Sequence, residues 1–122
     1  MDKNIKVAYK PEDITDLFLE YINSGNIEGL ISIYEDNAIL ILNSENEIAN
    51  GRNEIKEFYS KMLLTKPKFA KGQQRKAIIN GDIALTSSRL INGFVTAEVA
   101  RKQKDGSWRW FIDQPVITTE KV

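Results

Sequence analysis

Residues 80–110 read NGDIALTSSRLINGFVTAEVARKQKDGSWRW, and this stretch decides the fold. Three dipeptides divide it, namely Asn80-Gly81, Asn92-Gly93 and Asp105-Gly106, which are 12 and 13 residues apart. Asn-Gly and Asp-Gly favour the positive backbone angles of tight hairpin turns. The runs between them are rich in Ile, Val, Thr, Phe and Trp, which are typical strand residues. The C-terminal half is therefore predicted to be a four-stranded antiparallel meander.

The N-terminal half has the apolar spacing of helices. From Pro11 to about Asn23, apolar residues recur at i, i+3, i+4, i+7 and i+8, which predicts a first helix. Ser24-Gly25 ends this helix, and Asn26 can cap a second, shorter helix whose apolar positions run to Tyr34. Two amphipathic helices are thus expected before the first strand.

An aliphatic strand separates these helices from a third one. Residues 35–37 predict a turn, and the short run 38–42, Ala-Ile-Leu-Ile-Leu, favours a buried strand over a helix. Beyond Asn50-Gly51 the apolar stripe returns and predicts a third helix that ends at Lys66-Pro67. Helices first and strands after indicate an α+β domain in which three N-terminal helices pack on a curved antiparallel sheet.

Composition limits the class of protein. The 122 residues suit a single domain spanning 1–122, and 42% hydrophobic with 28% charged residues is typical of a globular chain. Lys plus Arg equals Asp plus Glu at 17 each, so no basic surplus favours nucleic acid as a partner. The longest aliphatic run, residues 38–42, is too short to span a membrane, which favours a cytoplasmic protein.

The chain has no Cys and no His. Thiolate and imidazole catalysis, and the common metal sites built from those side chains, are therefore excluded. We expect no metal and no cofactor, and any proton transfer would fall to carboxylates, Tyr or Lys.

Counting outward from the last two turns predicts a pair of acids. If both turns contain two residues, position 98 lies opposite 113 and 87. Glu98 and Asp113 are then cross-strand neighbours, and one of them would have a raised pKa because adjacent carboxylates cannot both ionise cheaply. With Arg89 diagonal to Glu98, these residues could form an acid/base or ligand-anchoring site. The alternative is a solvated or interfacial salt network.

The same register divides the meander into two faces that are both partly apolar. One face would carry Leu90, Val95, Ala97, Val99, Trp108, Trp110, Ile112 and Gln114, and the other Leu85, Ser87, Arg89, Thr96, Glu98, Ala100, Phe111 and Asp113. A sheet with one face in water would alternate more cleanly, so the second face should be covered by a dimer partner or by elements that line a pocket. We expect a homodimer.

The element order and three segments carry a resemblance to a known family. Residues 25–38, 50–55 and 105–109 resemble stretches of the nuclear transport factor 2-like superfamily, in its SnoaL-like and ketosteroid isomerase-like branch. The resemblance implies a cone-shaped fold with a small-molecule pocket, and dimerisation through the outer sheet face. Many SnoaL-like relatives place a histidine near the end of the last strand, where this chain has residues 111–114, Phe-Ile-Asp-Gln. A histidine mechanism therefore does not carry over.

The resemblance also suggests ligand-binding residues. Tyr21 could offer its hydroxyl to a ligand oxygen, as a Tyr does in ketosteroid isomerase, and Trp110 could stack on a flat ligand; Arg89 and Gln114 complete the candidate set. Tyr21 also lies on an apolar stripe and Trp110 can fill the core, so packing is the alternative for both. Tyr34 and Tyr59 also lie on apolar stripes, so the same preference for core packing applies to them.

Three functions fit these observations. The first is a small-molecule-binding domain with an apolar pocket for a hydrophobic or oxygenated ligand. The second is an isomerase, cyclase or dehydratase in which Asp113 or Glu98 moves a proton while Tyr21 or Arg89 steadies an oxyanion. The third is a non-catalytic dimerisation or partner-binding module, which requires a cone filled by its own side chains.

Overall fold

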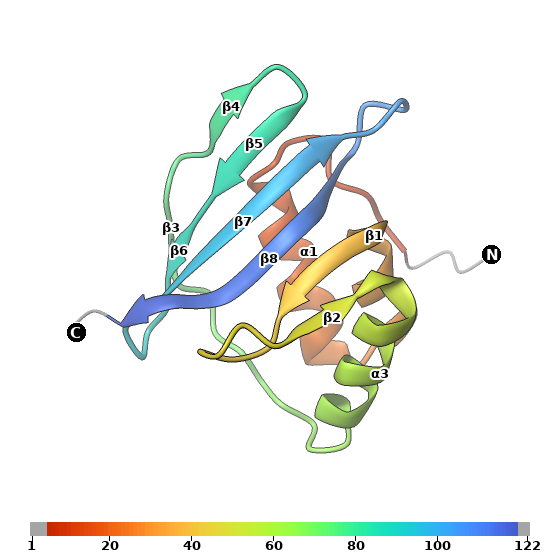
Figure 1. The fold of residues 1–122 in the computed structure, drawn as a ribbon, viewed down its shortest axis with the longest axis vertical. Coiled ribbons are helices and arrows are strands. Elements are labelled where there is room, and N and C mark those ends of the chain that lie inside the picture. The colour runs from red at the N-terminus through yellow and green to blue at the C-terminus, as the bar shows by residue number, and fades with distance from the viewer. Residues whose placement is uncertain (1–4, 120–122) are drawn as a thin grey trace.

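The computed structural model describes residues 5–119 (Figure 1). The elements in chain order are α1 (Asp13–Ser24), α2 (Ile27–Ser32), β1 (Tyr34–Ile41), β2 (Ile48–Asn50), α3 (Gly51–Leu63), β3 (Gln73–Gln74), β4 (Ile78–Asn80), β5 (Ile83–Thr86), β6 (Ser88–Arg89), β7 (Phe94–Lys102) and β8 (Trp108–Thr119). The helices cover one face of a twisted sheet (Figure 1). Among residues 5–119 there is no helix with the length and apolar character needed to cross a bilayer.

The sheet is mixed, which corrects the predicted all-antiparallel arrangement. Its main strand order is β2-β1-β8-β7-β5-β4, and β1 lies parallel to β8 while the other pairs are antiparallel. A parallel pair needs a long crossover, and here it comprises all the chain between β1 and β8. The predicted meander is further divided, because the short strands β3 and β6 pair with each other and β6 also pairs with β7.

Local signals in the sequence explain the first two helices. Gly25 ends α1 in the left-handed conformation with a φ of 71°, and its N–H donates to the Tyr21 carbonyl. Asn26 caps α2 as predicted, because its side chain accepts from the N–H of Gly29. A Cβ at Gly29 would overlap the Tyr21 ring, so only glycine allows α2 this close to α1.

The first strand begins earlier than the sequence predicts. We expected a helix up to Tyr34 and a turn at residues 35–37, but α2 ends at Ser32 and β1 runs from Tyr34 to Ile41. The N–H of Trp110 donates to the Ile33 carbonyl, so the chain pairs with β8 from this point and continues as a strand. The register between β1 and β8 shifts between Tyr34 and Ile39, which accommodates the polar residues 35–37 inside the strand.

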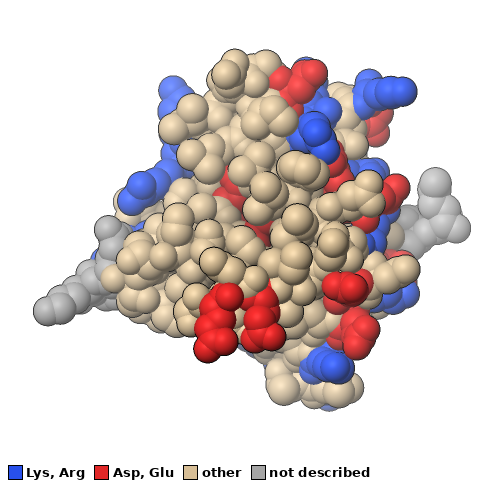
Figure 2. Space-filling model, in the orientation of Figure 1, with Lys and Arg blue, Asp and Glu red and all other residues tan. Residues whose placement is uncertain are grey.

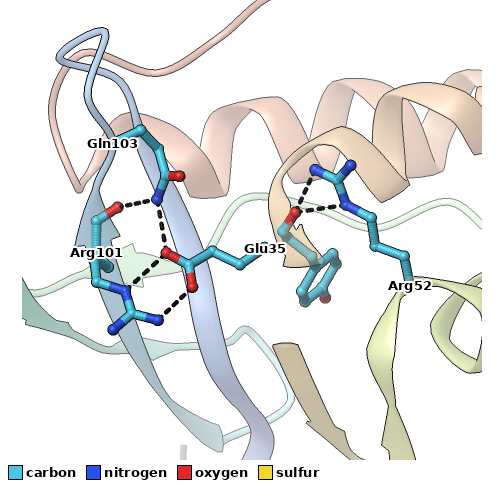
Figure 3. A network of polar contacts seen from close by, with 5 residues as sticks. Glu35, Arg52, Arg101 and Gln103 are labelled. Atoms are coloured by element: carbon cyan, nitrogen blue, oxygen red, sulfur yellow. Dashed lines mark hydrogen bonds and ion pairs between the residues drawn. The ribbon is translucent and has the colours of Figure 1, made fainter. Parts of the chain in front are cut away.

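Arginine side chains hold this irregular part of β1 (Figure 3). Glu35 accepts two hydrogen bonds from Arg101, at 2.9 and 2.6 Å, and one from Gln103 at 2.7 Å. Arg52 of α3 donates through two nitrogens to the Tyr34 carbonyl, at 2.9 and 2.6 Å. Arg52 therefore holds the Tyr34 backbone directly, and Arg101 and Gln103 hold the residue that follows it.

The hairpin before β7 differs from the predicted register by one residue. The Leu90 N–H donates to the Phe94 carbonyl, so residues 91–93 form a three-residue loop with Gly93 at a φ of 90°. This extra loop residue places Thr86 opposite Glu98 instead of Ser87. Arg89 then pairs with Val95.

The hairpin between β7 and β8 departs from the predicted register at two points, and the two shifts cancel. Its loop is also three residues long, because the Gln103 N–H donates to the Ser107 carbonyl and Lys102 pairs with Trp108. Phe111 is then an extra residue on β8 and forms a bulge that restores the expected register. Glu98 and Asp113 are paired as predicted.

These shifts rearrange the two predicted faces. The inner face, under the helices, carries two cross-strand rows. The first is Ala84, Ala100, Trp110 and Tyr34, and the second is Thr86, Glu98, Asp113 and Leu40. The outer face carries the row Leu85, Val99, Ile112 and Ile39. Trp110 therefore lies inside, beside Glu98 and Asp113, and Leu85 lies outside. Figure 2 shows the sheet from the outer side, with tan surface in the middle and most charged side chains toward the edges.

Candidate functional site

A cavity of about 640 Å³ opens between the helices and the inner face of the sheet. It is bounded by α1, α3, the segment 68–72, and the strands β7 and β8, and its wall is mostly apolar. The aromatic residues of the wall are Phe18, Phe58, Tyr59, Phe69, Phe94 and Trp110. Asn23 fixes one side of the cavity, because its side chain accepts from the N–H of Phe69 and donates to the carbonyl of the same residue.

Asp113 is the most enclosed acid of the wall. It stands on the inner face of β8 with only 4% of its surface exposed. The Tyr34 hydroxyl donates to its Oδ2 at 2.6 Å, and the hydroxyls of Tyr34 and Tyr59 lie 2.8 Å apart. A hydrogen-bonded chain thus links Asp113 on β8, through Tyr34 on β1, to Tyr59 on α3.

Glu98 lies beside Asp113 on β7 and is 5% exposed. Its Oε1 accepts from the Thr86 hydroxyl at 2.7 Å. Within residues 5–119, no Lys or Arg forms an ion pair with either of these two carboxyls. The two acids, named here the carboxyl pair, therefore share an apolar site with no cation from that part of the chain.

Burial and mutual repulsion favour the neutral form of the carboxyl pair. Burial, with the charge of Glu98 adding to it, raises the pKa of Asp113 to about 8 despite the opposing hydrogen bond from Tyr34. Burial likewise raises the pKa of Glu98. The pKa values of Tyr34 and Tyr59 are raised by burial and by the charge of Asp113, so both remain protonated. At neutral pH the carboxyl pair holds at least one proton.

This arrangement can exchange a proton with a bound molecule. A carboxyl group with a pKa near the working pH is suited to general acid or base catalysis. Tyr59 lines the cavity and is hydrogen-bonded to Tyr34, so a ligand oxygen near Tyr59 would be linked to Asp113 through two hydroxyls. The site can therefore bind a polar group or transfer a proton in surroundings that are otherwise apolar.

The lysines of the cavity wall are already engaged. The Lys68 Nζ donates to the Asn23 carbonyl at 2.6 Å, and Lys71 forms an ion pair with Asp16 at 2.9 Å. No cluster of three or more Asp or Glu side chains suited to a metal occurs in the part of the chain that the structure describes.

The structure brings together three of the predicted site residues. Asp113, Glu98 and Trp110 all line the cavity. Tyr21 does not, because its hydroxyl is bonded to the backbone of Lys6 in the core.

The two other candidates also lie outside the wall of the cavity. Gln114 pairs with Ala97 in the outer-face register of β7 and β8. Arg89 lies on β6 opposite Val95, because the longer hairpin loop moved it out of the predicted diagonal contact with Glu98.

Sequence reasoning missed Tyr34 and Tyr59 as site residues. Their positions on apolar stripes favour core packing, and both are in fact buried, at 0% and 3% exposed. The Tyr34 hydroxyl meets Asp113 because β1 lies parallel to β8, with Tyr34 opposite Trp110, and the Tyr59 hydroxyl meets that of Tyr34. A signal was present in the sequence, since a buried Tyr hydroxyl needs a partner and the predicted carboxyl pair offered one.

Comparison with known proteins establishes the fold. Neither protein-family models nor curated protein sequences match the chain. A candidate association domain of calcium/calmodulin-dependent protein kinase type II from Thiobacillus denitrificans superposes with a TM-score of 0.73 at 17% identity, covering 91% of this chain and 98% of that one. A ketosteroid isomerase-like protein from Erwinia carotovora atroseptica gives 0.64 at 19% identity, with 93% and 95% covered.

A third solved structure is an NTF-2-like protein of unknown function from Shewanella oneidensis, with a TM-score of 0.65, 17% identity, and 84% and 92% of the two chains covered. The chain has the nuclear transport factor 2-like fold. This confirms the fold that the sequence resemblance implied. At these identities the nuclear transport factor 2-like fold says nothing about which activity this chain has.

Proposed function

We propose that this chain is a small-molecule-binding domain that takes a mainly apolar ligand with a polar group directed at the carboxyl pair. The observation that carries the proposal is the cavity of about 640 Å³ with Asp113 and Glu98 in its wall. An apolar pocket with a few convergent polar groups is the usual form of a small-molecule site. An open cavity of this kind also argues against the third alternative, a cone filled by its own side chains.

The test is a thermal-shift screen against flat, oxygenated hydrophobic molecules. Ligands that bind the folded state raise the melting temperature by mass action. Met62 lines the cavity from α3, so Met62→Trp should fill part of it and abolish the shifts. Leu64→Trp adds the same indole at a site that is 82% exposed and outside the cavity wall, and it should leave the shifts intact. Equal shifts in wild type and Met62→Trp would refute the proposed site.

The second candidate function is a proton-transfer enzyme, such as an isomerase, cyclase or dehydratase. The chain of hydrogen bonds from Asp113 through Tyr34 to Tyr59 favours it, because Asp113 could take a proton from carbon while a tyrosine hydroxyl stabilises the resulting oxyanion. Ligands from the screen that contain a carbonyl should then exchange hydrogen for deuterium at the adjacent carbon. Exchange that is equally fast with wild type and Asp113→Asn would exclude this role.

We also propose that the chain forms a homodimer through the outer face of the sheet. The exposed apolar residues of β4 and β5 support this, since Ile78 and Leu85 pair with each other and are 67% and 47% exposed. Contiguous apolar surface of this kind commonly marks an interface between proteins. The dimer is independent of the cavity, which lies on the opposite face.

A further inference from the structure

We propose that the ligand of the cavity is an apolar amine, held as its ammonium ion by Asp113 and Glu98. This inference rests on the proposed small-molecule function and names its ligand class.

The carboxyl pair has no cation from residues 5–119, although it is almost fully enclosed. Asp113 and Glu98 are 4% and 5% exposed, and their hydrogen bonds come from neutral hydroxyls, that of Tyr34 on Asp113 and those of Thr86 and Thr96 on Glu98. A buried negative charge without a cation costs several kcal/mol in general. An ammonium group that enters the cavity would supply the missing charge and donate to both carboxyls.

The rest of the wall suits the hydrocarbon part of such a ligand. Phe18 connects the aromatic side chains, because its ring centroid lies 6.1 Å from that of Tyr59 and 6.0 Å from those of Phe69 and Trp110. Cations bind favourably over aromatic faces, most strongly over Trp. An aromatic wall next to unpaired carboxyls therefore favours an organic cation over a neutral molecule of the same size.

One polar group of the wall is also incomplete. The indole N–H of Trp110 is buried and has no hydrogen-bond partner in the described part of the chain. A buried donor without an acceptor costs free energy. This nitrogen has almost no accessible surface, so it does not contribute to the choice of ligand class.

An acidic ligand does not fit the same wall. Its carboxylate would lie near the carboxyl pair and be repelled, and the lysines of the wall are engaged elsewhere, Lys68 by the Asn23 carbonyl and Lys71 by Asp16. A neutral alcohol could hydrogen-bond with the acids but would leave an ionised acid of the pair without a cation. The amine is the ligand class that satisfies both the charge and the hydrogen bonds.

Amine binding should release protons. The pKa of Asp113 is raised to about 8 by burial and by the charge of Glu98, so the carboxyl pair is partly protonated at neutral pH. An ammonium ion stabilises the ionised form of both acids and displaces a proton. The other titratable groups that face the pair are Tyr34 from β1 and Tyr59 from α3, which keep their protons, and the other charged side chains of the cavity wall are Lys68 and Lys71.

The test compares three probes with one hydrocarbon frame, namely para-phenylbenzylamine, para-phenylbenzyl alcohol and para-phenylbenzoic acid. Calorimetric titration of wild type at about pH 7, in two buffers of different ionisation enthalpy, gives affinity and proton release together. We expect the amine to bind at least about tenfold more tightly than the alcohol, the acid not to bind, and a proton to be released only with the amine.

The double variant Asp113→Asn with Glu98→Gln removes both charges and keeps similar shape. Both substitutions are needed because a single variant leaves one acid that can still ionise. The double variant should bind the amine and the alcohol equally. A matched control, Glu45→Gln with Glu47→Gln, removes two exposed charges outside the cavity wall and should retain the preference for the amine.

Two results would overturn the inference and leave the proposed function standing. They are equal affinity for alcohol and amine in wild type, and an amine preference that persists in the double variant. If wild type binds none of the three probes, both the ligand class and the small-molecule function are contradicted.

Discussion

Replacing Asp113 with Asn should stabilise the fold at alkaline pH and change it little at acidic pH. The carboxyl keeps its proton in the folded protein up to a pKa of about 8, whereas in the unfolded chain it loses the proton near the usual value of 3.8. Between these values the unfolded state binds fewer protons, so the free energy of unfolding of wild type falls as the pH rises. Asn carries no titrating proton and avoids this loss.

The magnitude follows from the two pKa values. The difference between 3.8 and about 8 corresponds to an upper limit of about 6 kcal/mol, since each pKa unit is worth about 1.4 kcal/mol. Rearrangement of side chains around the ionised acid reduces this limit, so we expect a gain of about 2–6 kcal/mol at about pH 9. A small domain has only about 5–15 kcal/mol of total stability, so the effect should be large enough to measure.

Urea unfolding at about pH 5 and about pH 9 provides the assay. Trp108 and Trp110 are buried, at 6% and 4% exposed, and their fluorescence should report the transition. Asp82→Asn, the same change in an exposed turn, is the matched control and should shift neither midpoint appreciably. If Asp113→Asn has the same effect at both pH values, or if wild type becomes more stable as the pH rises to 9, the buried-acid reasoning is refuted.

Three further predictions test other parts of the structure. Tyr34→Phe removes the hydroxyl that binds Asp113 and should lower the free energy of unfolding by roughly 1–3 kcal/mol, measured by urea denaturation; an unchanged midpoint would contradict the buried hydrogen bond. Gly29→Ala should lower the free energy of unfolding by roughly 1–3 kcal/mol, because the added methyl group meets the Tyr21 ring. A thermal midpoint equal to that of wild type would show that α1 and α2 can separate freely. Leu85→Asp should convert a dimer to a monomer in analytical ultracentrifugation without changing the cavity, whereas a wild type that is already monomeric would remove the proposed interface.

Much of the architecture was predictable because local signals agree with the fold. The apolar stripe of α1, the Gly25 stop and the Asn26 cap each depend on neighbouring residues in the sequence. The strand register depends on longer-range features. The pairing of Glu98 with Asp113 was predicted correctly, but only because a longer loop and the bulge at Phe111 cancel each other.

The site was predictable only in part, for a related physical reason. Its acids lie on adjacent strands of one hairpin, so counting along the chain could bring them together. Tyr34 reaches Asp113 from β1 through a parallel strand pair, and Tyr59 on α3 is linked to Asp113 through the Tyr34 hydroxyl. Periodicity in the sequence identifies the buried face of an element but not which element it meets, so Tyr34 and Tyr59 were interpreted as core residues.

The most direct test of the account is a titration of the Asp113 side-chain carboxyl carbon by NMR, with and without a ligand found in the screen. We expect Asp113 in the free protein to titrate near a pKa of about 8 and a cavity ligand to move this value. A free-protein titration of Asp113 near its ordinary value, unchanged by ligand, would contradict the claim that a buried carboxyl pair forms the centre of a ligand site.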